Sequence, residues 1–151
     1  TTVLGTDQLK TPEEESALRG KCILVVDDEQ NIRETLDSIL SKLGCHVSMS
    51  SDGYEAINLI GQQYFDLIIS DIKLPHRNGY EIFAAARRVR DNFPVVLMTG
   101  FGYDPHHSIV RASQEGLSQV MFKPFKVNQL LEELHKALDL PIPEPKEADK
   151  H

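Results

Sequence analysis

Residues 22–29 read CILVVDDE, an uninterrupted apolar run that is followed at once by three acids. The run is short, rich in β-branched residues and apolar at every position, which is typical of a parallel strand buried on both faces. Asp27, Asp28 and Glu29 stand where this strand would end. The stretch therefore predicts an α/β protein with polar side chains at the carboxyl edge of its sheet.

Further apolar runs of strand length follow along the chain, at 46–49, 67–70, 95–98 and 119–122. Amphipathic segments lie between and after them, with apolar residues at helical spacing around 32–43, 56–60, 82–89, 109–112 and 130–138. Successive βα units with right-handed crossovers require helices on both faces of a parallel sheet. We predict a doubly wound, five-stranded parallel sheet of the flavodoxin-like (βα)5 type, with strand order 2-1-3-4-5.

The ends of the chain differ in character from this block. Residues 1–20 are polar and predict a linker or a short N-terminal helix, because Thr11-Pro12-Glu13-Glu14 has the pattern of a capping box. Residues 141–151 read PIPEPKEADKH and predict an extended, Pro-rich tail. The domain itself is predicted to span residues 21–140.

Composition excludes several classes of function. The chain has 151 residues, 40 % of them hydrophobic, and a formal net charge of −7, which describes an ordinary globular domain. The negative charge argues against direct binding of nucleic acid or of an anionic membrane surface. No apolar run approaches the roughly 20 residues of a membrane span, and no secretory signal is recognisable, so we expect a cytoplasmic protein. Cys22 and Cys45 fit small buried thiols, although the sequence leaves a disulfide open.

Polar groups directly follow the other predicted strands as well. Asp71 follows the third strand, Thr99 the fourth and Lys123 the fifth. The carboxyl ends of parallel strands share one edge, so the carboxylates of Asp27, Asp28 and Asp71 should meet a hydroxyl and an amine there. Singly, these residues would be helix caps, strand ends or a solvated lysine, and their convergence is what indicates a site.

The chemistry of this set points to phosphoryl transfer. Clustered carboxylates repel one another unless a cation is present, and hard oxygen ligands suit Mg²⁺. A carboxylate can also act as a nucleophile and form an aspartyl phosphate. The phosphoryl oxygens then need further donors, which Lys123, the Thr99 hydroxyl and the backbone N–H of Gly100 can supply.

The chain resembles the receiver domain of two-component response regulators from Lys21 to Leu140. Four motifs in order carry the resemblance: VVDDE at 25–29, SDIKLPHRNG at 70–79, LMTG at 97–100 and FKPF at 122–125. The resemblance implies a phospho-acceptor of a phosphorelay within a larger signalling protein. Such a domain is not a turnover enzyme and catalyses only its own phosphorylation and dephosphorylation.

The resemblance also implies a role for each residue. Asp71 would be phosphorylated, while Asp27, Asp28, Asp71 and the backbone carbonyl of Lys73 would hold Mg²⁺. Thr99 and Lys123 would contact the phosphoryl group, and the Lys123–Pro124 bond would be cis. The implied donor is a histidine kinase or a histidine phosphotransfer domain, whereas the downstream partner and the oligomeric state are not specified.

One position departs from the family, and three other functions compete. Val120 stands where members often carry Tyr or Phe, which removes the usual aromatic relay. A pseudo-receiver that only binds partners is disfavoured by the intact set of site residues. A Mg²⁺-dependent phosphatase would need an acid two residues after Asp71, where Lys73 stands. A flavin protein would need a phosphate-binding loop after the first strand, and none is present.

Overall fold

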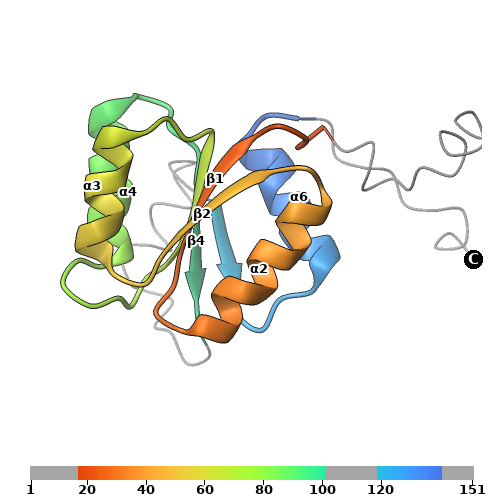
Figure 1. The fold of residues 1–151 in the computed structure, drawn as a ribbon, viewed down its shortest axis with the longest axis horizontal. Coiled ribbons are helices and arrows are strands. Elements are labelled where there is room, and N and C mark those ends of the chain that lie inside the picture. Colours follow the sequence, from red (N-terminus) through yellow and green to blue (C-terminus); the bar gives the residue numbers. More distant parts are fainter. Residues whose placement is uncertain (1–16, 101–118, 141–151) are drawn as a thin grey trace, which may run out of the picture.

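A parallel sheet forms the centre of the computed structural model, which describes residues 17–100 and 119–140 (Figure 1). Its strands lie in the order β2-β1-β3-β4-β5, as the sequence predicts. They span β1 (Cys22–Val26), β2 (His46–Ser50), β3 (Leu67–Asp71), β4 (Val95–Thr99) and β5 (Gln119–Phe122). The helices of the described residues are α2 (Gln30–Lys42), α3 (Gly53–Gln62), α4 (Gly79–Val89) and α6 (Val127–Ala137).

The helices cover the sheet from both sides, which creates two cores. α2 and α6 pack on one face and α3 and α4 on the other (Figure 1). Alternate residues of β1 serve the two faces, since Ile23 and Val25 belong to the first core and Leu24 and Val26 to the second. β3 and β4 are buried at every position, which explains why their sequences are mostly apolar up to their polar ends.

Three strands run one residue further than their predicted runs, and two of them, β3 and β4, end on a residue of the predicted site. Asp71 is the last residue of β3 and Thr99 is the last residue of β4. Both side chains therefore have the fixed orientation of a paired strand and not that of a mobile loop. Two polar groups of the carboxyl edge are thus part of the paired strands themselves.

The N-terminal end of the described chain belongs to the packed fold. Leu18 is fully buried in the core beneath α2, although it lies within the segment predicted as a linker or short helix. The N–H of Gly20 donates to the carbonyl of Gly44 at 2.9 Å, which ties this turn to the end of α2. The capping box at 11–14, the helix expected around 109–112 and the Pro-rich tail lie outside the described residues.

None of the helices within the ranges 17–100 and 119–140 combines the length and the apolar character that crossing a membrane requires.

Glycine at position 53 is required by a close approach of two segments. A Cβ added there would lie 1.7 Å from the carbonyl oxygen of Arg77, in the loop between β3 and α4. Gly61, in the same helix, has no atom within 4 Å of the corresponding point. Comparing an alanine substitution at Gly53 with one at Gly61 therefore distinguishes a backbone clash from the general preference of helices for alanine.

We expect Gly53→Ala to lower the free energy of unfolding by at least about 2 kcal/mol, because a backbone oxygen cannot turn aside as a side chain can. Gly61→Ala should raise it by about 0.5 kcal/mol, through the better helix propensity of alanine. Urea denaturation of the two variants measures both effects. A Gly53→Ala protein as stable as the parent would show that the two segments do not touch in solution.

Candidate functional site

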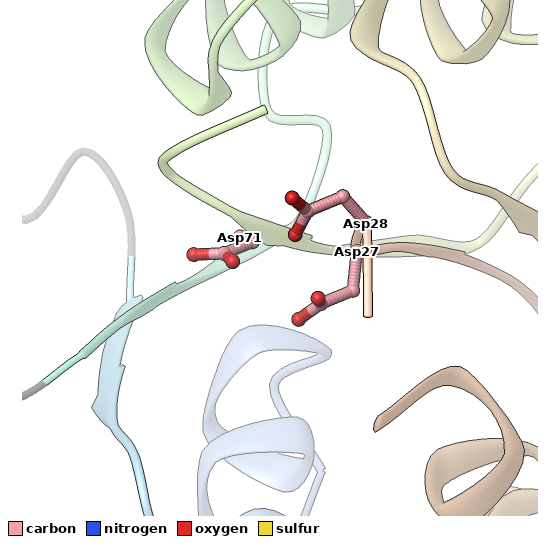
Figure 2. A group of neighbouring side chains, drawn as sticks. All are labelled: Asp27, Asp28 and Asp71. Atoms are coloured by element: carbon pink, nitrogen blue, oxygen red, sulfur yellow. The ribbon is translucent and has the colours of Figure 1, made fainter. Parts of the chain in front are cut away.

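Three carboxylates meet at the carboxyl edge of the two central strands. Asp27 follows β1 directly and Asp71 ends β3, and these strands pair with Val26 opposite Ser70. One carboxylate oxygen from each of Asp27, Asp28 and Asp71 lies within 4.8 Å of the others. In Figure 2 the side chains of Asp27 and Asp28 both reach toward Asp71 from the end of β1. The sequence therefore predicted this juxtaposition correctly.

The three acids differ in their exposure to solvent. Asp27 is fully buried, Asp71 is 8 % exposed and Asp28 is exposed. Asp27 and Asp28 do not cap α2, because Glu29 occupies the N-cap position and makes no capping hydrogen bond with its side chain. The alternative interpretation of the acid pair as helix caps is therefore wrong. Because Asp28 is exposed and Asp71 is partly accessible, a ligand can reach the three carboxylates from solvent.

Lys123 bridges the two buried acids. Its Nζ lies 2.8 Å from Oδ2 of Asp27 and 3.0 Å from Oδ2 of Asp71, and its side chain is only 14 % exposed. Glu29 is a more distant neighbour, with Oε1 at 3.6 Å. The peptide bond between Lys123 and Pro124 is cis, as predicted. A lysine from the edge strand thus reaches the centre of the site.

Burial and ion pairing oppose each other in this triad. Burial is the largest influence on Asp27 and raises the pKa of its carboxyl, although the hydrogen bond from Lys123 acts in the opposite direction. Burial alone would lower the pKa of Lys123, but the hydrogen bonds to Asp27 and Asp71 outweigh it and the pKa is raised. Lys123 therefore stays protonated at neutral pH. One ammonium faces three carboxylates, so the site retains negative charge for a cation.

The backbone fixes the second oxygen of each buried carboxylate. Oδ1 of Asp27 accepts the N–H of Glu29 at 2.9 Å, and Oδ1 of Asp71 accepts the N–H of Ile72 at 2.7 Å. With Lys123 on the Oδ2 atoms, each carboxylate is held at both oxygens. Such preorganisation suits a site whose ligand geometry matters.

Thr99 lies on the far side of Asp71 from the acid pair. It ends β4, is 2 % exposed, and its backbone carbonyl accepts the N–H of Lys123 at 2.8 Å. Lys123 is therefore held by its backbone to β4 and by its side chain to the acids of β1 and β3. The structure brings Thr99 and Lys123 to the edge where the sequence predicted them.

The loop between β3 and α4 contains Lys73, which is exposed. This loop returns close to its origin, since the N–H of Gly79 donates to the carbonyl of Ile72 at 2.8 Å. A Cβ on Gly79 would lie 2.7 Å from the carbonyl oxygen of Asp71, so only glycine fits there without a shift of the backbone. Metal binding by the Lys73 carbonyl stays a prediction.

Sequence reasoning missed Arg33. Its Nη1 donates to the backbone carbonyl of Asp27 at 2.7 Å, from the first turn of α2. The side chain thereby fixes the main chain at the start of the acid pair. The available signal was its spacing, since a long basic side chain in the first helical turn can fold back over the preceding loop.

Val120 lies within β5, at the position where the sequence resemblance implies an aromatic residue. It is partly buried and packs against the core beneath α3 and α4. Its side chain is therefore a small packing element of the sheet.

We expect Lys123→Met to lower the free energy of unfolding of the metal-free protein by about 2–3 kcal/mol at pH 8, because Asp27 and Asp71 lose their shared cation. The loss should shrink toward pH 5. The pKa of Asp27 is already raised by burial, and without Lys123 the carboxyl takes up a proton more readily as the pH falls.

Urea denaturation at both pH values in the presence of EDTA measures this loss. Lys42→Met, at the exposed end of α2, is the control and should change stability by less than about 0.5 kcal/mol. An equal loss for Lys123→Met at pH 5 and pH 8 would mean that side-chain packing, and not charge, is responsible.

Comparison with known proteins assigns this arrangement to a family. Residues 23–135 match the family model described as the response regulator receiver domain. The Regulator of RpoS from Escherichia coli (strain K12) is 37 % identical over 116 residues, which cover 76 % of this chain and 34 % of that protein. This chain therefore spans about a third of the length of such curated relatives.

Relatives of similar size also match. Sporulation initiation phosphotransferase F from Bacillus subtilis (strain 168) is 29 % identical over 119 residues, which cover 78 % of this chain and 94 % of that protein. A crystal structure of the response regulator protein TrrA from Thermotoga maritima, in complex with Mg²⁺ and BeF, superposes with a TM-score of 0.67 at 31 % identity. The superposed region covers 78 % of this chain and 99 % of the TrrA chain.

Proposed function

The chain belongs to the response regulator receiver domain family of two-component signalling, and we propose that Asp71 is the residue that accepts the phosphoryl group. The supporting observation is the position of its carboxylate. Asp71 is 8 % exposed, is the last residue of a paired strand, contacts Lys123 at 3.0 Å and lies beside Asp27 and Asp28. It is thus accessible to a donor and surrounded by the groups that phosphoryl transfer needs.

Asp27, Asp28 and Asp71 would hold a Mg²⁺ ion, together with the backbone carbonyl of Lys73. The donor set fits, because it consists of hard oxygen atoms and carries more negative charge than Lys123 neutralises. The ion would supply positive charge for the oxygens of the transferred group. The structure of TrrA with Mg²⁺ and BeF is a precedent for such a ligand pair on this fold.

The proposed reaction is the transfer of a phosphoryl group from a phosphohistidine. A carboxylate oxygen of Asp71 forms a bond to phosphorus while the bond from phosphorus to the histidine nitrogen breaks, and that nitrogen keeps the electron pair and takes up a proton. Lys123 then moves its hydrogen bond from the Asp71 carboxylate to a phosphoryl oxygen. The Thr99 hydroxyl donates to another.

The phosphoryl donor in this proposal is a histidine kinase or a histidine phosphotransfer domain in the cytoplasm. The chain would catalyse only the gain and loss of its own phosphoryl group. The chain covers 34 % of the RpoS regulator but 94 % of the sporulation phosphotransferase, so relatives of both lengths use this domain. We propose that it is one domain of a larger signalling protein.

Phosphorylation provides the decisive test. With MgCl₂ and acetyl phosphate, the intact protein should gain the mass of one phosphoryl group, and peptide mapping after borohydride reduction should place it on Asp71. Asp71→Asn should gain none, whereas Asp37→Asn, whose carboxylate in α2 accepts a hydrogen bond from Ser41, should behave like the parent. No gain in the parent, under conditions where a known receiver domain reacts, would identify a pseudo-receiver that binds partners without phosphorylation.

Metal binding can be tested separately from phosphorylation. A ligand that binds only the folded protein raises its stability by about 1.4 kcal/mol at ten times its dissociation constant. MgCl₂ should therefore raise the melting temperature of the parent more than NaCl of equal ionic strength. Asp28→Asn should abolish most of this rise, because its exposed carboxylate serves the proposed ion and not the core. An equal rise in the parent and in Asp28→Asn would exclude the proposed ligand set.

A further inference from the structure

The loop that follows Asp71 is clamped at two points. At its base, the N–H of Gly79 donates to the carbonyl of Ile72 at 2.8 Å. At its tip, the N–H of Gly53 donates to the carbonyl of Pro75 at 3.2 Å. Lys73 and Leu74 are the two residues between Ile72 and Pro75, the outgoing points of the two clamps. The conformation of Lys73 therefore depends on how firmly both clamps hold.

A side-chain pair reinforces the tip clamp. Nδ1 of His76 is paired with Oδ2 of Asp52, the residue before α3. Oδ1 of the same carboxylate caps α3 by accepting the N–H of Tyr54 at 2.6 Å and that of Glu55 at 3.3 Å. One carboxylate thus fixes the start of a helix and holds the neighbouring loop against it.

The backbone of His76 needs such support. Its φ is +68°, in the left-handed region that glycine adopts freely and that other residues, even the more tolerant Asn, Asp and His, adopt uncommonly. The Asp52 pair offsets that strain by holding the imidazole. The adjacent Arg77 contributes locally, because its guanidinium donates to the carbonyl of His76 and lies 3.7 Å from Glu81.

Asp52 is also connected, through Ser50, to the loop that carries Asp27 and Asp28. The N–H of Asp52 donates to Oγ of Ser50 at 3.2 Å, and the carbonyl of Ser50 accepts the N–H of Asp27 at 3.1 Å. The turn before α3 therefore connects the two loops that would supply metal ligands. Lys123 joins the same two elements from the opposite side, through Asp27 and Asp71.

We propose that Asp52 and His76 are positioning residues for the metal site, which hold the backbone carbonyl of Lys73 in place and so set the affinity for Mg²⁺. This inference rests on the proposed Mg²⁺ site. A backbone carbonyl has no rotamers with which to correct its position, so its placement depends on the path of the loop. Outer partners that orient metal ligands commonly change affinity by one to two orders of magnitude, and less is expected of an exposed pair.

The test is titration of the metal-free protein with MgCl₂, followed by amide NMR. His76→Gly keeps access to the left-handed backbone but removes the imidazole, and should weaken Mg²⁺ binding about three- to tenfold. His76→Asn also accepts this backbone and can donate its amide to Asp52, so it should bind within about twofold of the parent. His46→Asn, an exposed histidine at the other end of the sheet, is the control and should match the parent.

A second variant tests the partner. Asp52→Ser can still cap α3 but is too short to reach His76, and should weaken binding as much as His76→Gly does. The double variant should lose no more than either single variant, because both remove one interaction. A purely structural role would lower the free energy of unfolding in urea and leave the Mg²⁺ affinity unchanged.

The outcomes separate the inference from the function on which it rests. Parent-like affinity in His76→Gly, or equal losses in His76→Gly, His76→Asn and His46→Asn, would overturn the positioning role while the metal site stands. A parent that binds no Mg²⁺ would overturn the proposed site and this inference with it. Two results together would support the Mg²⁺ site and the positioning role. His76→Asn would bind Mg²⁺ nearly as tightly as the parent, and the double variant would lose no more affinity than either single variant.

Discussion

The ammonium of Lys123 between Asp27 and Asp71 is the interaction on which the rest of the site depends. The sheet order places β1 and β3 side by side in the centre, so two acids at their ends become neighbours and would repel one another. Lys123 reaches them from the end of β5, at the sheet edge, across β4. Its positive charge allows the two acids to stay buried without a metal. It neutralises only part of the negative charge of the carboxylates. The folded site is therefore stable and still attractive to a divalent cation.

The rigidity of the surrounding loops follows from close approaches of the backbone. Gly79 brings the start of α4 against the carbonyl of Asp71, and Gly53 brings the start of α3 against that of Arg77. Neither approach leaves room for a Cβ, so the path of the loop is fixed by contact between main chains. A loop held in this way can present a carbonyl as precisely as a strand presents a side chain. α3 contributes no ligand to the proposed metal site, but its first residue helps to fix the loop that would carry one.

Sequence alone predicted the part of this structure that periodicity controls. Continuous apolar runs identified β3 and β4, and their polar ends placed Asp71 and Thr99 at one edge of the sheet. Contacts that depend on the path of loops could not be predicted in this way. His76 meets Asp52 from a backbone in the left-handed region, and Leu18 lies in the core next to the turn that Gly20 joins to Gly44. Neither event leaves a repeating pattern in the sequence.

The position of Lys123 also bears on how a phosphorylated site could signal. Its backbone N–H is bound to the carbonyl of Thr99, so the ends of β4 and β5 are coupled directly. In the proposed mechanism the side chains of Lys123 and Thr99 both turn toward the phosphoryl group. Phosphorylation would therefore act on the ends of β4 and β5 together. Val120, small and packed against the core, offers no aromatic ring that could swing between two positions. The backbone hydrogen bond between Lys123 and Thr99 therefore connects the contacts of Asp71 to the outer edge of the sheet.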